Sequence, residues 1–294
     1  MTTQNLSGKV ALIQGGSRGI GAAIVKRLAA QGAAVAFTYV SSAAKAAELQ
    51  NSVISAGGKA LAIQADSADA TAIRNAVNAT VQAFGRLDIL VNNAGVLRDR
   101  MSFNMAEEEF DLVMKVHCKG HFAMVRHAAQ RWREAAKSSG SVYGRVINTA
   151  SEAGLLGSAG NSNYAMAKAA IAALTISIAR EMGKYGVTSN FMAPRARTRM
   201  TESMPNNSMF AKPESGFDVF HPRWPAELVV FLASEAAADI NGQGFIVWGG
   251  EVTLIKGWHI VNQISGGGGP ITAQDLVKRK DELFGTHPRQ PTYM

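Results

Sequence analysis

The chain has 294 residues, of which 47% are hydrophobic and 18% are charged. This length suits one large α/β domain, and this balance excludes a chain that is disordered throughout. No apolar run approaches the roughly 18 residues that cross a bilayer, so we expect no membrane-spanning segment. The polar N-terminal stretch, residues 1–8, lacks the apolar core of a secretion signal, which predicts a cytoplasmic protein.

The formal charge is +8, but the basic residues are dispersed, and no basic stripe is interleaved with aromatic residues. This distribution argues against nucleic-acid binding and favours anionic small molecules as partners. Cys118 is the one cysteine of the sequence, which excludes an internal disulfide and fits a reducing compartment. Its apolar-periodic surroundings predict a buried structural thiol rather than a nucleophile. No metal site is expected.

Short apolar runs alternate with longer helical patterns from residue 9 to about residue 250. In chain order, the patterns predict a strand at 10–13, a helix at 20–31, a strand at 34–39, a helix at 43–55, a strand at 60–64, a helix at 70–84, a strand at 87–91, a helix at 107–136, a strand at 145–149, a helix at 164–185, and strands at 187–192 and 244–248. This alternation predicts an α/β fold: a doubly wound, Rossmann-like parallel sheet with helices on both faces.

Two regions break the alternation. Residues 195–225 are punctuated by proline and rich in methionine and aromatic residues, which is typical of a lid or binding loop. The four glycines at 266–269 predict a flexible joint, and the stretch from Thr272 predicts a capping box that opens a short charged helix. We therefore expect one domain over 1–250, including the lid, and a C-terminal arm over 251–294.

A glycine-rich turn, Gly15-Gly-Ser-Arg-Gly19-Ile-Gly21, follows the first strand. Glycines let the backbone turn sharply and approach a pyrophosphate, and the N-terminus of the following helix offers N–H groups to phosphates. The strand before the turn and the helix after it are the context that a dinucleotide site requires, although an ordinary glycine-rich turn is the alternative. The residues expected to contact the cofactor here are Gly15, Ser17, Arg18, Gly19, Ile20 and Gly21.

The second strand ends without an acidic residue, in the sequence Phe-Thr-Tyr-Val-Ser-Ser at 37–42. An NAD-specific site needs a carboxylate there, whereas hydroxyls and a guanidinium bind a 2′-phosphate. Tyr39, Ser41 and Ser42, together with Arg18, therefore favour NADP, with NAD as the alternative. The other interpretation of Arg18 is a solvated surface arginine.

Tyr164 and Lys168 are four residues apart, on one face of a predicted helix, and Ser151 directly follows the fifth strand. A ketone that gains hydride at carbon needs a proton at oxygen, and a phenol with an ordinary pKa of ~10 holds that proton at neutral pH. A nearby ammonium lowers the phenol pKa, so that the phenol also acts as a base in the reverse direction. Ser151 is expected to hydrogen-bond the substrate oxygen.

Three features together resemble the short-chain dehydrogenase/reductase family: the Gly-x3-Gly-x-Gly spacing, the sequence Asn92-Asn-Ala-Gly95, and the pattern of Ser151, Tyr164 and Lys168. The resemblance implies an oxidoreductase that interconverts a secondary alcohol and a ketone with a nicotinamide cofactor. It also implies a homotetramer or homodimer formed through the two long helices.

The resemblance further implies cofactor contacts after several strands, from Asp66, Ser67, Asn93, Ala94, Gly95, Tyr164, Lys168, Pro194 and Thr198. Asp66 has a competing interpretation as the N-cap of the next helix. Gln14 stands where the family often has a threonine that braces the glycine turn. His117 replaces an asparagine that holds a proton-relay water in the family; it is interpreted either as a relay group or as a packed helix histidine.

Up to Gly95 the chain resembles 3-oxoacyl and carbonyl reductases. From Val96 on, it is similar to the (3R)-hydroxyacyl-CoA dehydrogenase part of multifunctional enzyme type 2 and to bacterial 17β-hydroxysteroid dehydrogenases. The resemblance rests on the stretches 97–100, 116–120, 194–201 and 244–249. That branch normally has an acidic residue after the second strand, and this chain does not.

The expected substrates are 3-hydroxyacyl or 3-oxoacyl thioesters, including those of coenzyme A, or steroid-like ketones. A broad carbonyl reductase acting on small or aryl ketones is the first alternative, and a non-catalytic NADP-binding regulator is the second. Arg195, Arg197 and Arg199 are interpreted either as ligands of coenzyme A phosphates or as solvated loop residues. The methionine- and phenylalanine-rich lid suits a bulky apolar substrate, or it packs against the protein body.

Overall fold

The computed structural model describes residues 5–202, 207–256, 260–265 and 270–288. The chain divides into two units, 1–255 and 256–294. The four glycines expected to form a joint lie outside the described residues.

Unit 1 is built on one eight-stranded sheet with the order β3-β2-β1-β4-β5-β6-β7-β8. The strands are β1 (Val10–Gln14), β2 (Ala34–Tyr39), β3 (Lys59–Gln64), β4 (Ile89–Asn92), β5 (Gly144–Thr149), β6 (Val187–Pro194), β7 (Gly244–Trp248) and β8 (Glu251–Ile255). Neighbours from β3 to β7 are parallel, and β8 pairs antiparallel with β7. The predicted doubly wound parallel sheet is therefore confirmed.

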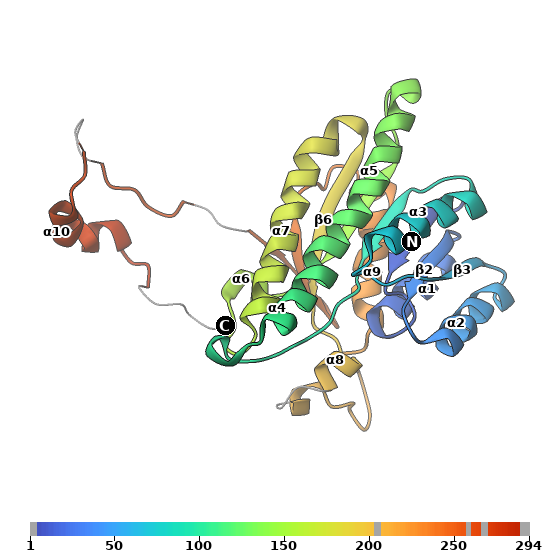
Figure 1. Cartoon of the computed structure of the whole chain (residues 1–294), viewed down its shortest axis with the longest axis horizontal. Helices are drawn as coiled ribbons and strands as arrows, with labels where there is room; N and C mark the ends of the chain where they lie inside the picture. The colour runs from blue at the N-terminus through green and yellow to red at the C-terminus, as the bar shows by residue number, and fades with distance from the viewer. Residues whose placement is uncertain (1–4, 203–206, 257–259, 266–269, 289–294) are drawn as a thin grey trace. The chain divides into compact units, whose positions relative to one another are not determined.

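The helices cover both faces of this sheet (Figure 1). Their bounds are α1 (Gly19–Ala30), α2 (Ala43–Ser55), α3 (Ala70–Phe84), α4 (Glu107–Met114), α5 (Gly120–Ser139), α6 (Ala153–Leu156), α7 (Ser162–Met182), α8 (Arg199–Glu202) and α9 (Arg223–Ala233). One hydrophobic core joins α1, α2 and α9 to the sheet, and a second joins α3, α5 and α7 to its other face. In Figure 1, α5 and α7 are the two long helices that run side by side.

Three details differ from the sequence-based expectations. The helix predicted at 107–136 is interrupted by a π turn, η2 (Lys115–Lys119), between α4 and α5. Residues 251–255, expected in the arm, form β8, because a two-residue glycine turn pairs Trp248 with Glu251. Residues 223–225, expected to end the loop, instead begin α9, which buries its apolar face against α1.

Unit 2 contains α10 (Ala273–Phe284). The predicted capping box is confirmed at its N-terminus: Asp275 N donates to Thr272 Oγ1 at 3.2 Å, and Thr272 N donates to Asp275 Oδ2 at 2.9 Å. Within the described ranges, none of the helices of either unit combines the length and apolarity that a membrane crossing requires.

Candidate active site

The expected site residues gather at one edge of the sheet. The glycine turn follows β1, the segment 93–96 follows β4, Ser151 follows β5, and Pro194 ends β6. These strands are adjacent and parallel, so their carboxyl ends open on the same edge. The strand order reverses between β1 and β4, which is where ligands bind in sheets of this kind.

The glycine turn is folded too tightly to admit side chains at two positions. Gly15 has φ +72°, and a Cβ there would lie 2.8 Å from the Cα of Ala94. A Cβ at Gly21 would lie 2.2 Å from the carbonyl oxygen of Gly15. The glycines therefore bring the N-terminus of α1 to the edge, beside the segment after β4, and leave a cradle that a Cβ would fill. This is the arrangement that a pyrophosphate needs.

A side chain on β2, Thr38, provides the hydrogen bond that holds this turn, a role that was not predicted for it. Gly15 N donates to Thr38 Oγ1 at 2.9 Å, and Asn93 Nδ2 donates to the Gly15 carbonyl at 3.2 Å. Gln14, at the position where the family often has threonine, is fully buried, and neither polar atom of its side chain has a protein partner. Thr38 on β2 thus supplies a hydrogen bond at the turn that Gln14 does not.

Basic and hydroxyl side chains flank the turn. Tyr39 and Ser42 are half-buried, and Ser41 is exposed. Burial lowers the pKa of Arg18 and the nearby positive charge of Arg199 lowers it further. Two guanidiniums that influence each other in this way mark a region where an anion is favoured.

The remaining predicted cofactor residues lie around this cradle. Ser17 and Ile20 are half-buried on the turn itself. A Cβ at Gly19 would lie 3.4 Å from Cγ2 of Thr198, so the loop after β6 reaches the turn. Ser67 is buried after β3.

Asp66 does not cap the next helix, so that interpretation was wrong. Its Oδ1 accepts from Ala68 N at 2.9 Å. The N-cap of α3 is Asp69, whose carboxylate accepts from the backbone N–H groups of Thr71 and Ala72. The exposed Asp66 carboxylate is therefore not used as a helix cap.

Ser151, Tyr164 and Lys168 meet at the same edge of the sheet. The Ser151 hydroxyl is close enough to the Tyr164 phenol to lower its pKa, and Lys168 Nζ lies 5.4 Å from the centroid of the Tyr164 ring. Lys168 is buried and donates from Nζ to the Thr149 carbonyl at 2.6 Å. The structure thus brings the three expected catalytic residues together.

The pKa values of the pair are shifted in opposite directions. Burial raises the pKa of Tyr164 to about 12, and the nearby Ser151 hydroxyl offsets part of this rise. Burial also lowers the pKa of Lys168 to about 7. From the sequence, the lysine ammonium is expected to lower the phenol pKa. In the chain as it stands desolvation dominates, and the phenol is held in its acid form.

His117 lies on the π turn and packs against the backbone segment that follows β4. Its Nε2 is 3.0 Å from the backbone nitrogen of Val96 and 2.9 Å from the Val96 carbonyl oxygen. Its ring meets the Tyr164 ring edge-on, with 5.4 Å between centroids. Burial, with a further contribution from Lys168, holds the pKa of His117 well below its usual range. A neutral imidazole therefore contacts the Tyr164 ring.

Sequence reasoning missed His121, one helical turn further along on α5. It is fully buried, its Nε2 lies 3.2 Å from the Ala94 carbonyl, and burial lowers its pKa to about 3. Its ring centroid is 6.2 Å from that of His117. The spacing of four residues was the available signal, because such residues share one helix face.

Two of the arginines after Pro194 form ion pairs within the protein. Arg195 pairs with Glu152, its Nε donating to Oε2 at 2.7 Å, and its guanidinium lies 5.1 Å from the Trp248 ring. Arg197 pairs with Asp218. Both are therefore engaged within the protein.

A family model described as short chain dehydrogenase matches residues 9–208. The hydroxyacyl-CoA dehydrogenase ChsB1 of Mycobacterium tuberculosis is 45% identical, over 98% of this chain and 92% of its own length. A 3-oxoacyl-(acyl-carrier-protein) reductase of Synechocystis is 37% identical, over 84% of this chain and 98% of its own length. Both kinds of relative were expected from the sequence.

Solved structures agree. A short chain dehydrogenase from Mycobacterium avium superposes with a TM-score of 0.86 and 40% identity, over 98% of both chains. A short chain dehydrogenase from Burkholderia cenocepacia, solved in complex with NADP, superposes with a TM-score of 0.73 and 37% identity, over 84% of this chain and 98% of its own. The chain therefore belongs to the short chain dehydrogenase family.

Proposed function

We propose that this oxidoreductase interconverts a 3-hydroxyacyl and a 3-oxoacyl thioester with NADP(H), using Tyr164 as the acid and base. The observation that carries the proposal is the cluster of Ser151, Tyr164 and Lys168 beside the glycine turn. The thioester substrate is supported by the names of the two relatives, a hydroxyacyl-CoA dehydrogenase and a 3-oxoacyl reductase. Steroid-like ketones are a further candidate, since the chain resembles hydroxysteroid dehydrogenases.

The residues around the glycine turn fit a dinucleotide. The cradle at Gly15 and the N-terminus of α1 would hold the pyrophosphate. Arg18 and the hydroxyls after β2, with no acidic residue at 37–42, would receive a 2′-phosphate better than a free ribose. Lys168 would hold the nicotinamide ribose. The complex of the Burkholderia relative with NADP supports this preference, and NAD is the alternative.

When bound, the nicotinamide cofactor supplies hydride to the substrate carbon or accepts it. Tyr164 gives its proton to the substrate oxygen in the direction of reduction, and its raised pKa keeps that proton available at neutral pH. The Ser151 hydroxyl hydrogen-bonds the same oxygen as negative charge develops. Lys168, with a pKa of about 7, is poised to carry charge near the phenol.

Tyr164→Phe tests the catalytic role, with Tyr185→Phe as the matched control. We expect the variant to lose turnover of acetoacetyl-CoA with NADPH by about 10²- to 10⁴-fold, while NADPH binding, followed by its fluorescence, is retained. Unchanged turnover would refute the mechanism. Wild-type protein that binds NADPH and turns over neither acetoacetyl-CoA nor an aryl ketone would favour the regulator, and a preference for the aryl ketone would favour the carbonyl reductase.

The proposal also covers the substrate lid, the domain boundary, the oligomeric state and the location of the protein. Residues 195–222, the part of the predicted lid that precedes α9, serve as a substrate lid over a catalytic domain that extends to Ile255, and the residues beyond it form the arm. Exposed apolar side chains on α5 and α7, including Phe122 and Met166, support a homotetramer or homodimer through these helices. Light scattering measures this assembly, and fractionation of cells tests the cytoplasmic location.

A further inference from the structure

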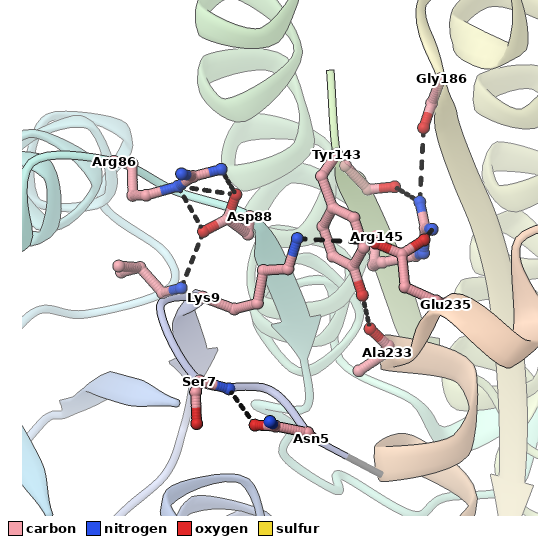
Figure 2. A network of polar contacts seen from close by, with 12 residues as sticks. Asn5, Ser7, Lys9, Arg86, Asp88, Tyr143, Arg145, Gly186, Ala233 and Glu235 are labelled. Carbon is pink, nitrogen blue, oxygen red and sulfur yellow. Dashed lines mark hydrogen bonds and ion pairs between the residues drawn. The ribbon is translucent and has the colours of Figure 1, made fainter. Parts of the chain in front are cut away.

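A cavity of about 340 Å³ opens at the amino ends of β5 and β6. Its walls include Tyr143, Arg145, Thr188 and Glu235. Figure 2 shows the polar contacts of three of these residues, Tyr143, Arg145 and Glu235. Ser151 follows the carboxyl end of β5, so the cavity lies at the opposite edge of the sheet from the candidate active site. We infer that this cavity binds a small anion that carries a carboxylate or phosphate group.

The buried guanidinium of Arg145 has an edge whose hydrogen-bonding capacity is not used. Arg145 is 3% exposed, and its Nη1 donates to the carbonyls of Gly144 at 2.9 Å and Gly186 at 3.4 Å. Its Nε is buried and has no partner, and its Nη2 lies 3.7 Å from Glu235, beyond hydrogen-bond distance. The Nε–Nη2 edge of arginine is the one that pairs with two oxygens of a carboxylate or phosphate.

A second donor lies on the same wall. Thr188 is 5% exposed and its Oγ1 has no partner. Buried polar side-chain atoms are nearly always hydrogen-bonded, so two unpartnered atoms on residues that line one cavity point to a ligand that satisfies both once the side chains turn toward it. The cavity volume is at the lower end of the range for small-molecule sites, which suits a small metabolite.

The charge balance also favours an anion. Lys9 and Arg145 lie over the Tyr143 ring, at 3.5 and 4.0 Å from its centroid. The nearby carboxylate of Asp88 is already engaged with Arg86 and with a backbone N–H. The Glu235 carboxylate is then the shared ion-pair partner of Lys9 and Arg145, at 3.7 Å from each.

Glu235 is a weak internal competitor for the site. Its side chain is 72% exposed, so an exposed ion pair holds it loosely and solvent can replace its contacts at little cost. An anion that enters the cavity displaces this carboxylate from Arg145 and forms two hydrogen bonds where Glu235 forms none.

Thermal unfolding with inorganic phosphate, and separately with succinate, tests the inference at constant ionic strength. We expect a saturable rise of the melting temperature in the wild type. In Glu235→Gln, which lacks the competitor, saturation should need a several-fold lower anion concentration. Glu134→Gln is the matched control, because Glu134 is equally exposed and ion-paired with Lys137, and it should behave as wild type.

Arg145→Lys keeps the charge but loses the two-point edge, and we expect at least tenfold weaker binding. If that variant does not fold, Thr188→Val should weaken binding a few-fold. Arg18→Ser should leave the Glu235→Gln effect unchanged, which separates this cavity from the phosphate-binding turn. A response to phosphate alone identifies a phosphate ligand, and one to succinate alone a carboxylate. The inference fails if neither anion gives a saturable rise, or if Glu235→Gln saturates as the wild type does.

Discussion

The buried amine of Lys168 makes the stability of the folded chain depend on pH. Burial lowers its pKa to about 7, whereas an amine in the unfolded chain has a pKa of ~10.4. Between these values the unfolded state binds more protons, so the free energy of unfolding rises with pH. At about 1.4 kcal/mol per pKa unit, the gain from pH 7 to pH 9 is about 2 kcal/mol, after allowing for half-protonation at the lower pH.

Urea denaturation at pH 7, 8 and 9 measures this gain. Lys168→Met should lack the rise, and Lys119→Met, which removes an exposed lysine from the same site region, should keep it. Cys118 acts in the opposite direction, because burial raises its pKa, and the comparison between variants cancels that contribution. Equal pH dependence in wild type and Lys168→Met would show that the amine stays charged in the folded protein, and the reasoning would fail.

Three further substitutions test individual contacts by urea denaturation. Asp88→Ala should cost about 3 kcal/mol, because its 2% exposed carboxylate accepts from Val10 N at 2.8 Å; a loss below about 1 kcal/mol would contradict this. Trp132→Phe should cost about 2 kcal/mol through the lost Nε1 bond to the Leu87 carbonyl at 2.7 Å and the space left behind, and an unchanged midpoint would count against it. Gln14→Met should gain about 1 kcal/mol, because it removes a buried amide without protein partners; a loss instead would indicate that the amide is satisfied by water.

The sheet and the glycine turn could be predicted because their signals are local. Each of β1, β4 and β5 is a continuous buried run, and parallel strands covered on both faces need such runs. The spacing of Tyr164 and Lys168 along one helix is equally local. The raised phenol pKa was not predictable, since it depends on how much protein surrounds the ring.

Two elements were missed although the sequence carried their signals. Gly249 and Gly250 separate two apolar runs by two residues, which is a strong hairpin signal, and β8 follows them. Pro222 and Pro225 were interpreted as loop residues, but they occupy the N-cap and first turn of α9. Proline is tolerated there because the first N–H groups of a helix have no partner within it.

Other features depend on contacts between distant parts of the chain. The π turn holds His117 under Gly95, where a Cβ would lie 2.6 Å from the imidazole Cε1. The pair of Arg195 and Glu152 joins the loops after β6 and β5. No local pattern reports such contacts, because each requires the strand order to be known first.

The titratable groups at the site share one cause for their shifts. Burial is the largest effect on Tyr164, Lys168, His117 and His121, raising the pKa of the acid and lowering those of the bases. Four such groups can be packed together because each shift favours the neutral form, so at neutral pH the half-protonated Lys168 carries the one partial charge among them. An anionic ligand beside Lys168 would favour its protonated form, and the new ammonium would then favour the phenolate. Because the cofactor is bound in both directions of the reaction, its binding would bring the phenol pKa closer to neutrality for both proton donation and proton acceptance.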